Sequence, residues 1–171
     1  AGSDTLATSR ALSLVLQREN PDLIICGRNS TDGETGQVGP EIAEIMGLPH
    51  VSHVRKLDLS ADGKSVVVER ITDEGYQTLW CDMPVVVCVT EGVAPELYPD
   101  KEQMERAEGM SVEELTAADL RVDLDQFGAS GSPTWVDEIR LVEPNRLGVL
   151  LEETTPEEAA KQVADALRQR L

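Results

Sequence analysis

The sequence predicts an α/β fold in which helices flank a parallel sheet. Two short, continuous apolar segments, Asp22–Cys26 and Pro84–Thr90, have the composition of strands that are buried on both faces. The first lies between two segments with helical periodicity, and helix, buried strand, loop and helix make up half of a doubly wound fold. A chain of 171 residues, 40% of them hydrophobic, is large enough to bury a core of its own.

The first predicted helix ends at Asn20, because a residue that precedes a proline avoids the helical region. A polar loop, Gly27–Gly36, follows the first buried strand. The second helix begins near Gln37 and ends at Gly47. The apolar side of the first helix consists of Ala7, Ala11, Leu12, Val15 and Leu16.

Three short strands are predicted in the middle of the chain, at Val51–Leu57, Ser65–Ile71 and Tyr76–Cys81. They are separated by turns that contain Asp62-Gly63 and Glu74-Gly75, and acidic-glycine turns between such segments are typical of hairpins. We therefore expect an antiparallel hairpin excursion, after which Pro84–Thr90 returns to the parallel sheet.

The segment Glu91–Glu108 is polar and carries two prolines, so we expect it to be irregular. Ser111 and Glu114 have the spacing of a capping box, which predicts a short helix through Leu120.

The last part of the chain alternates between loop and helix signals. We expect a Gly/Ser/Pro loop at Phe127–Pro133 and an extended segment at Thr134–Val142. Thr155 and Pro156 are typical of a helix start, and apolar residues at helical spacing continue to Leu171.

The chain is strongly acidic, with 15 basic and 32 acidic residues and a net charge of −17. Such a charge repels phosphate backbones and anionic membranes, so we expect no nucleic acid partner. The apolar runs are too short to cross a bilayer and no basic-then-apolar leader opens the chain, which predicts a cytoplasmic protein without direct membrane insertion. Abundant Asp and Glu with few Lys fits a high-salt cytoplasm and an ordinary acidic protein equally well.

No metal site or catalytic set is predicted. The three cysteines have no CxxC spacing, and Cys26 and Cys88 lie in apolar runs as small buried hydrophobes do. His50 and His53 occupy one predicted strand at i, i+3, which directs them to opposite faces. The sequence shows no supported Ser/His/Asp arrangement and no HExxH motif. These observations favour binding or carrying over catalysis.

The loop after the first buried strand is the candidate ligand site, because open α/β sheets bind ligands beyond the carboxyl ends of their strands. Its glycines allow close approach of the backbone, and the free N–H groups of the next helix suit a phosphate. The segment matches neither GxGxxG nor GxxxxGK[ST], so nucleotide binding and a plain connection both remain open. The candidate residues are Gly27, Arg28, Asn29, Ser30, Thr31, Asp32, Gly33, Glu34, Thr35, Gly36, Gln37 and Val38.

Asp32 and Glu34 do not fit a phosphate site, because both are acidic. Their charges would repel a phosphate unless the carboxylates point away from it or cap backbone N–H groups.

Several motifs in order resemble the β (small) subunits of electron-transfer flavoproteins. The segment from Asp32 to Pro40, followed by Gly47-Leu48-Pro49, resembles the family's nucleotide loop and the helix after it. A second match runs from Val68 to Cys88, through the acidic-glycine turn and the proline before an apolar strand. Later segments, Ser130–Thr134 and the helix that starts at Thr155, resemble members related to the bifurcating branch.

The resemblance implies a Rossmann-like domain of the adenine-nucleotide-binding type that lacks the family's N-terminal strands. It implies a nucleotide-binding domain at residues 1–150 and a C-terminal helical arm at 151–171. It also implies a heterodimer with an α subunit that holds FAD, with AMP or a second FAD bound by the β subunit on Gly27–Val38. Electrons would pass between a flavin dehydrogenase and an acceptor, so we expect a carrier subunit and no enzyme.

The expected partner surfaces match the family unevenly. The strands Val51–Cys81 would pack on the α subunit, and the arm Thr155–Leu171 would embrace a neighbouring domain. In the family's recognition loop, here Glu91–Gly109, Lys101 replaces an anchoring leucine and glutamates replace positive charge. The alternatives are a stand-alone adenine-nucleotide-binding regulatory module without redox activity and a structural fragment with an empty pocket.

Overall fold

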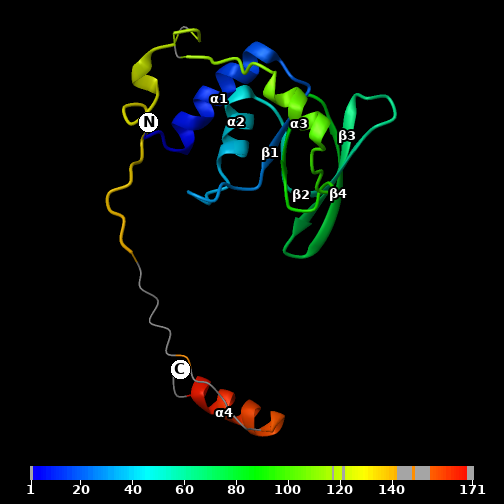
Figure 1. Ribbon diagram of the computed structural model, residues 1–171, viewed down its shortest axis with the longest axis vertical. Coiled ribbons are helices and arrows are strands. Elements are labelled where there is room, and N and C mark those ends of the chain that lie inside the picture. Colours follow the sequence, from blue (N-terminus) through cyan, green and yellow to red (C-terminus); the bar gives the residue numbers. More distant parts are fainter. Residues whose placement is uncertain (1, 117, 121, 142–147, 149–154, 169–171) are drawn as a thin grey trace. The chain divides into compact units, whose positions relative to one another are not determined.

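The computed structural model describes residues 2–116, 118–120, 122–141, 148 and 155–168. The chain forms two compact units, Ala1–Trp135 and Val136–Leu171. The first contains a five-stranded sheet and three α-helices, and the second contains helix α4 (Pro156–Arg168) (Figure 1). The division into residues 1–150 and 151–171 that the family resemblance implies stays a prediction.

The sheet is mixed, and its strands lie in the order β1-β5-β2-β3-β4. Strand β5 pairs in parallel with β1 on one side and with β2 on the other. Strands β2, β3 and β4 pair antiparallel in turn. The predicted α/β class is therefore confirmed. The strands are β1 (Leu23–Gly27), β2 (His50–Leu59), β3 (Ser65–Thr72), β4 (Gly75–Asp82) and β5 (Val85–Val89).

The predicted antiparallel hairpins are confirmed, and their strands continue the main sheet. Strand β2 is antiparallel to β3 along one edge and parallel to β5 along the other, with Val51 opposite Val87. The three strands thus continue the parallel sheet without a break. Local turn signals predict which strands form hairpins, but they carry no information about where β5 inserts.

Helices α1 (Thr5–Glu19) and α2 (Val38–Met46) pack against each other, and α2 also contacts β5 and β2 (Figure 1). Both were predicted. Helix α1 starts at Asp4, whose carboxylate accepts a hydrogen bond from the N–H of Ala7 at 2.9 Å. It ends at Asn20, which is left-handed with φ 48°. Helix α2 ends at Gly47, also left-handed, as is common at helix C-termini.

Each face of the sheet carries an apolar cluster. Residues Ile24, Ile42, Ala43 and Val86 form the cluster between the sheet and α2. The other cluster consists of Val51, Val54, Val66, Val68, Val85 and Val87. Strand β5 contributes to both, which confirms that its continuous apolar run marks a strand buried on both faces. The same prediction is wrong for β1, an edge strand whose Ile25 is 57% exposed.

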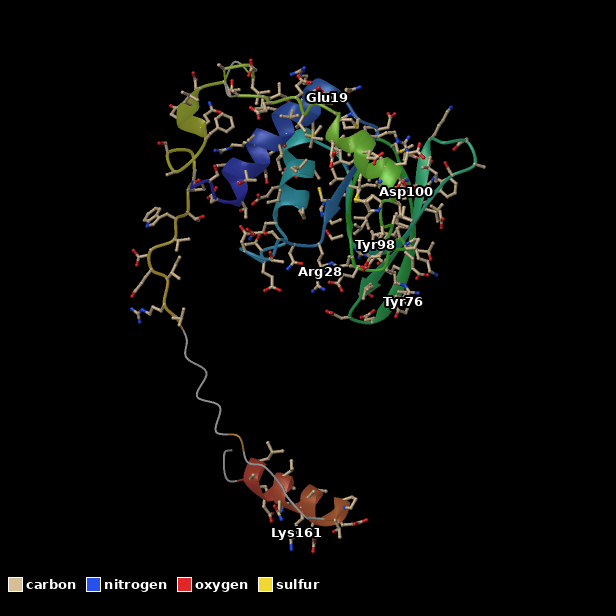
Figure 2. The ribbon with its side chains drawn as sticks, in the orientation of Figure 1. Glu19, Arg28, Tyr76, Tyr98, Asp100 and Lys161 are labelled. Carbon is tan, nitrogen blue, oxygen red and sulfur yellow. The ribbon has the colours of Figure 1, made fainter. Side chains whose placement is uncertain are left out.

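The outer hairpin of β3 and β4 ends in a polar network. Tyr76 lies beside the turn between the two strands (Figure 2), and the Arg55 guanidinium stacks 3.9 Å from the centre of its ring. Arg55 also forms an ion pair with Glu69. Both contacts join β2 to the hairpin and hold the end of the sheet together.

The segment after β5 differs from the prediction in two places. Helix α3 (Lys101–Glu108) lies in the part expected to be irregular, and a capping box formed by Asp100 and Gln103 starts it. The helix predicted from Ser111 to Leu120 is wrong, because the described residues of that segment form none. Instead the carboxylate of Asp119 accepts hydrogen bonds from the backbone N–H and the hydroxyl of Thr116, a local turn that competes with a helix.

The predicted Gly/Ser/Pro loop returns to the start of the chain. A short 3₁₀ helix, η1 (Leu124–Gln126), precedes it. The N–H of Asp4 donates to Ser132 Oγ at 2.8 Å, and Thr134 donates to the Asp4 carboxylate from both its N–H and its hydroxyl. Arg10 donates to the carbonyl of Gly131. The first unit is therefore closed by contacts across most of its length.

Helix α4 confirms the predicted tail helix over its described residues. Thr155 and Glu158 form the capping box at its start. Residues 169–171 of the prediction lie outside the described residues, as does Val142 of the segment predicted to be extended; residues 134–141 of that segment form no helix or strand. Among the helices described, none combines the length and apolarity that crossing a membrane requires.

Candidate functional site

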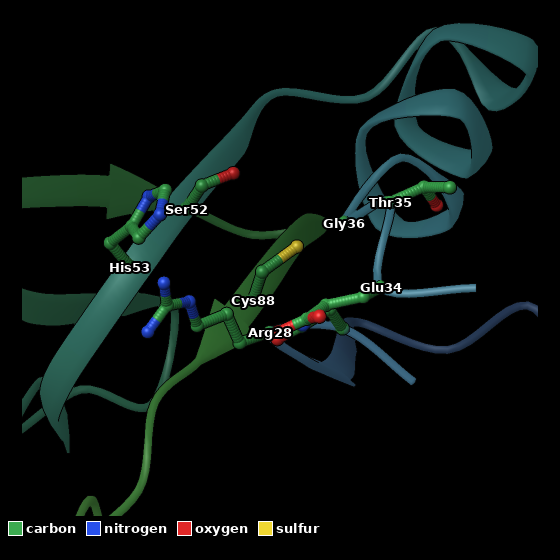
Figure 3. Close-up of a pocket in the computed structure, with 8 residues that line it drawn as sticks. Arg28, Glu34, Thr35, Gly36, Ser52, His53 and Cys88 are labelled. Carbon is green, nitrogen blue, oxygen red and sulfur yellow. The ribbon is translucent and has the colours of Figure 1, made fainter. Parts of the chain in front are cut away.

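The candidate site lies at the edge where the parallel strands end. Strands β1 and β5 run parallel with Gly27 opposite Val89, so the segments that follow the two strands leave the sheet at the same edge. The β1–α2 loop crosses this edge and bounds a cavity of about 340 Å³. The cavity is lined by Arg28, Asn29, Glu34, Thr35, Gly36, Ser52, His53 and Cys88 (Figure 3).

The middle of the loop is a tight turn, and the carboxylate of Asp32 is hydrogen-bonded to residues of that same turn. The N–H of Glu34 donates to the carbonyl of Ser30 at 3.0 Å. The pKa of Asp32 is lowered because its carboxylate accepts hydrogen bonds from the Ser30 hydroxyl and the Gly33 N–H. Asp32 does not line the cavity, and these hydrogen bonds within the turn stabilise its carboxylate. Glu34 does line it, with a left-handed backbone at φ 50°.

The loop enters helix α2 through Gly36, where the backbone is left-handed with φ 64°. A Cβ at this position would lie 3.2 Å from the carbonyl oxygen of Arg28, so the positive φ and this close approach of the two ends of the loop both favour glycine. The next residue, Gln37, is the N-cap of α2, and its side chain does not cap the helix. The N–H of Gln37 donates to Thr35 Oγ1 at 3.4 Å. In the first turn of α2, Val38 and Gly39 carry N–H groups that the Gln37 side chain does not cap, whereas Pro40 has none. Free N–H groups at a helix N-terminus suit an anion.

Helix α1 holds the first turn of α2 in place. The hydroxyl of Thr5 lies 3.1 Å from Gln37 Oε1 and from Glu41 Oε1, and Ser9 Oγ donates to Glu41 Oε2 at 2.8 Å. Ser9 is fully buried. The carboxylate of Glu41 is thus engaged by α1.

A bulge in β2 brings Ser52 and His53 to the cavity. The pairing with β5 shifts between Val51 and Val54, so that Ser52 and His53 together stand opposite Cys88. His53 has a left-handed backbone at φ 60°, which interrupts the alternation expected of a regular strand. The sequence did not predict Ser52 or His53 as site residues, and no local sequence motif predicts the bulge.

Cys88 is the third residue that sequence reasoning missed. It lies on β5 directly beside Cys26 of β1 and is 4% exposed. The pKa of Cys88 is lowered to about 7, because its sulfur accepts hydrogen bonds from the Cys26 thiol and the Ser52 hydroxyl. The pKa of Cys26 is raised by that same hydrogen bond and by burial. The sequence could have indicated Cys88 as a site residue, because it lies at the carboxyl end of the second predicted buried strand.

The cavity combines positive and neutral polar groups with one carboxylate. Figure 3 shows the Arg28 guanidinium reaching toward the His53 ring, with Cys88 between the loop and β2. Within the described part of the chain, Arg28 has no acidic partner at ion-pair distance. Arg28 and His53 also line a second hollow beside the β3–β4 turn. An unpaired guanidinium at such an edge suits a phosphate or carboxylate ligand.

The structure brings five of the predicted residues to the cavity and places the others around it. Gly27 ends β1, Val38 starts α2 and packs against the core cluster beside it, and Gln37 contacts α1. The remaining predicted residues, Ser30, Thr31, Asp32 and Gly33, do not line the cavity. Nucleotide binding by this set stays a prediction.

The described residues contain no group of three or more His, Cys, Asp or Glu side chains with the geometry of a metal site. The lining of the cavity is mostly polar.

The family comparison matches residues 1–120 to the electron transfer flavoprotein domain. The chain is 39% identical over 137 residues to the electron transfer flavoprotein subunit beta of Thermoanaerobacterium thermosaccharolyticum, covering 80% of this chain and 52% of the relative. It is 33% identical over 159 residues to the same subunit of Clostridium acetobutylicum, covering 93% and 61%.

A third relative, protein FixA of Rhizobium leguminosarum bv. phaseoli, is 32% identical over 174 residues, covering 98% of this chain and 62% of its own length. The chain thus spans between half and two thirds of these curated relatives. The family match over residues 1–120 includes the loop, the helix after it and strand β5. The chain belongs to the electron transfer flavoprotein family, among its β subunits.

Proposed function

We propose that this chain serves as the nucleotide-binding part of an electron-transfer flavoprotein β subunit, and that the cavity beside α2 binds an adenine nucleotide. The observation that carries the proposal is the position of the cavity. It lies at the carboxyl ends of β1 and β5, beside a helix N-terminus that has no side-chain cap. Open α/β sheets bind phosphate-bearing ligands at this place.

The residues present fit such a ligand. A cavity of about 340 Å³ lies at the lower end of the range for small-molecule sites, roughly 300–1,000 Å³. Arg28 supplies a positive charge without an acidic partner among the described residues, and Gly36 permits close backbone approach. Asn29 and Ser52 offer neutral donors and acceptors for ribose or base. AMP and the adenosine diphosphate part of FAD share this chemistry.

The sheet supports the finer description of the fold as Rossmann-like. Its parallel part, β1-β5-β2, has α1 and α2 on one side and the cavity at its carboxyl edge. In this proposal residues 1–150 form the nucleotide-binding domain and residues 151–171 the arm.

The role we propose is that of an electron carrier without catalytic residues of its own. A bound flavin supplies the one- or two-electron chemistry. The residues of this chain bind and orient the nucleotide: Arg28 and the first turn of α2 hold phosphate, and the β2 bulge presents Ser52 and His53 to the remainder.

The partners we propose are an α subunit and a flavin dehydrogenase. One face of the β3–β4 hairpin carries Ile71, Tyr76 and Trp80, which are 44%, 63% and 64% exposed. Exposed apolar side chains gathered on one face are typical of interaction surfaces, which supports packing of this hairpin on the α subunit.

The deciding experiment is to co-express the complete protein that carries this chain with an α subunit and to release its nucleotides with acid. Two FAD per heterodimer would place a flavin in this cavity, and one FAD with one AMP would make the nucleotide structural. A folded protein that carries AMP without flavin and forms no heterodimer would favour the regulatory alternative. Absence of any nucleotide and of the heterodimer would overturn the proposal.

The variant Arg28→Gln tests the site directly. Loss of the cation should weaken nucleotide binding about tenfold, as expected for one charge-assisted hydrogen bond. The matched control is Arg18→Gln near the far end of α1, where the arginine pairs with Glu113 on the surface. Binding should be unchanged in the control, as measured by calorimetry on protein stripped of nucleotide. Equal affinities in both variants would place the phosphate elsewhere.

A further inference from the structure

Two cysteines lie side by side beneath the first turn of α2. Cys26 of β1 and Cys88 of β5 are direct partners in the parallel register, so their side chains project from the same face of the sheet. Neighbouring strands are about 4.8 Å apart. This spacing falls within the range of Cα separations that disulfides span, roughly 4.4–6.8 Å.

The contacts of Gly39 show that the two sulfurs converge. A Cβ built on Gly39 would lie 2.4 Å from Cys88 Sγ and 3.6 Å from Cys26 Sγ. Both sulfurs therefore approach the same point of α2. The missing side chain of Gly39 leaves them the room that they share.

Cys88 can be reached from the cavity, because it forms part of its lining. Its sulfur is also the more nucleophilic of the pair. Hydrogen bonds from the Cys26 thiol and the Ser52 hydroxyl favour its thiolate and lower its pKa. The thiolate is the form of cysteine that reacts with peroxides.

We propose that Cys26 and Cys88 form a reversible dithiol–disulfide pair that hydrogen peroxide oxidises within the folded protein. In the first step the Cys88 sulfur attacks one peroxide oxygen, an S–O bond forms, and the O–O bond breaks. The departing oxygen takes the Cys88 proton and leaves as water. In the second step the Cys26 sulfur attacks the Cys88 sulfur, and the hydroxyl leaves with the Cys26 proton as a second water. The two thiols lose two electrons and the peroxide gains them.

The third cysteine provides an internal control. Cys81 lies on β4 and packs against the cluster on the other face of the sheet. It has no cysteine partner in the described register, where it stands opposite Val66. The pKa of Cys81 is raised by burial and by the charge of Asp82, which disfavours its thiolate.

The test treats the complete, folded and reduced protein with hydrogen peroxide, then denatures it, alkylates the remaining thiols and maps the peptides by mass spectrometry. The expected result is that Cys26 and Cys88 both lose their alkylatable thiols while Cys81 keeps its own, with a peptide that links Cys26 to Cys88. A dithiol reductant should restore both. Retention of both the Cys26 and the Cys88 thiol, or a disulfide that includes Cys81, would overturn the proposal.

Two variants keep the result interpretable. In Cys26→Ser the attacking partner is removed, so Cys88 should accumulate as a sulfenic acid that dimedone captures, and no intramolecular disulfide should form. Cys81→Ser should form the Cys26–Cys88 disulfide to the same extent as the unmodified protein. A loss of disulfide in Cys81→Ser, or dimedone labelling of Cys81 in place of Cys88 in Cys26→Ser, would contradict the assignment.

Discussion

Gly39 marks the closest approach of helix α2 to the sheet. The substitution Gly39→Ala should destabilise the protein, because its Cβ would lie 2.4 Å from Cys88 Sγ in a buried site. Overpacking of this kind costs about 1–3 kcal/mol, and the higher helix propensity of alanine offsets up to about 1 kcal/mol. Urea denaturation of the variant measures the net change in the free energy of unfolding.

The double variant Gly39→Ala with Cys88→Ala isolates the cause. With the Cys88 sulfur removed, the nearest remaining atoms are those of Cys26, at 3.4 and 3.6 Å. The cost of Gly39→Ala should then be smaller than in the parent protein. Equal costs in both backgrounds would mean that the two sites are not coupled.

Asp4 connects the start of α1 to the segment around Thr134. The pKa of its carboxyl is lowered, chiefly by the hydrogen bond from the Ala7 N–H and also by those from Thr134. A lowered pKa in the folded state means that this stabilisation is complete above the unfolded value, about 3.9, and is lost as the pH falls through the folded value. We expect Asp4→Ala to lower the urea midpoint at neutral pH, with a difference from the parent that shrinks in acid.

The control for Asp4 is Asp4→Asn, which keeps an acceptor for the Ala7 N–H but cannot ionise. Between neutral pH and acid, its denaturation midpoint should approach that of the parent in the same window. A difference that stays constant down to the lowest pH would show that ionisation of Asp4 does not stabilise the fold.

At the scale of elements, two buried serines on α1 form a matched pair. Ser9 is fully buried and donates to Glu41 of α2, whereas the buried hydroxyl of Ser13 has no hydrogen-bond partner in the described structure. Ser9→Ala should lower the free energy of unfolding by about 1.5–3 kcal/mol, the range for hydrogen bonds to charged groups. Ser13→Ala should be neutral or stabilising, because it removes an unsatisfied polar group. Thermal or urea unfolding of both variants tests the pair, and equal effects would contradict the contact.

The elements that the sequence predicted well are those with a strong local signal. The proline after Asn20, the glycine at position 47 and the unbroken apolar run of β5 each reflect one physical constraint. Helix α3 was missed although Asp100 and Gln103 have capping-box spacing, because the prolines before them suggested irregular structure. Ser111 and Glu114 have the same spacing without a helix, so the motif alone does not decide.

The candidate site was half predictable for a related reason. The residues Arg28, Asn29, Glu34, Thr35 and Gly36 follow one strand and share one stretch of sequence. Ser52, His53 and Cys88 come from two other strands, and only the insertion of β5 between β1 and β2 brings them to the loop. Strand order and bulges depend on pairing between distant segments, which local patterns do not encode.

At the scale of the whole molecule, a net charge of −17 implies strong self-repulsion. Salt shortens the range of this repulsion, from a Debye length of about 10 Å at 0.1 M to about 3 Å at 1 M. We expect the melting temperature to rise as KCl is raised from low to molar concentration. Circular dichroism melts measure the shift, and sucrose at equal osmolality controls for solute exclusion. A melting temperature that stays constant or falls in KCl would show that repulsion does not limit stability.

The position of β5 in the sheet affects the order in which the strands can pair during synthesis. Strands β2, β3 and β4 follow one another in the chain and in the sheet, so they can pair as soon as each is made. Strand β5 comes later in the chain but lies between β1 and β2, and its pairing joins Leu23 to Val85. A nascent chain that is synthesised from its N-terminus therefore has its hairpins before it has its cavity. The cavity is complete only when Cys88 and its neighbours take their place in the sheet.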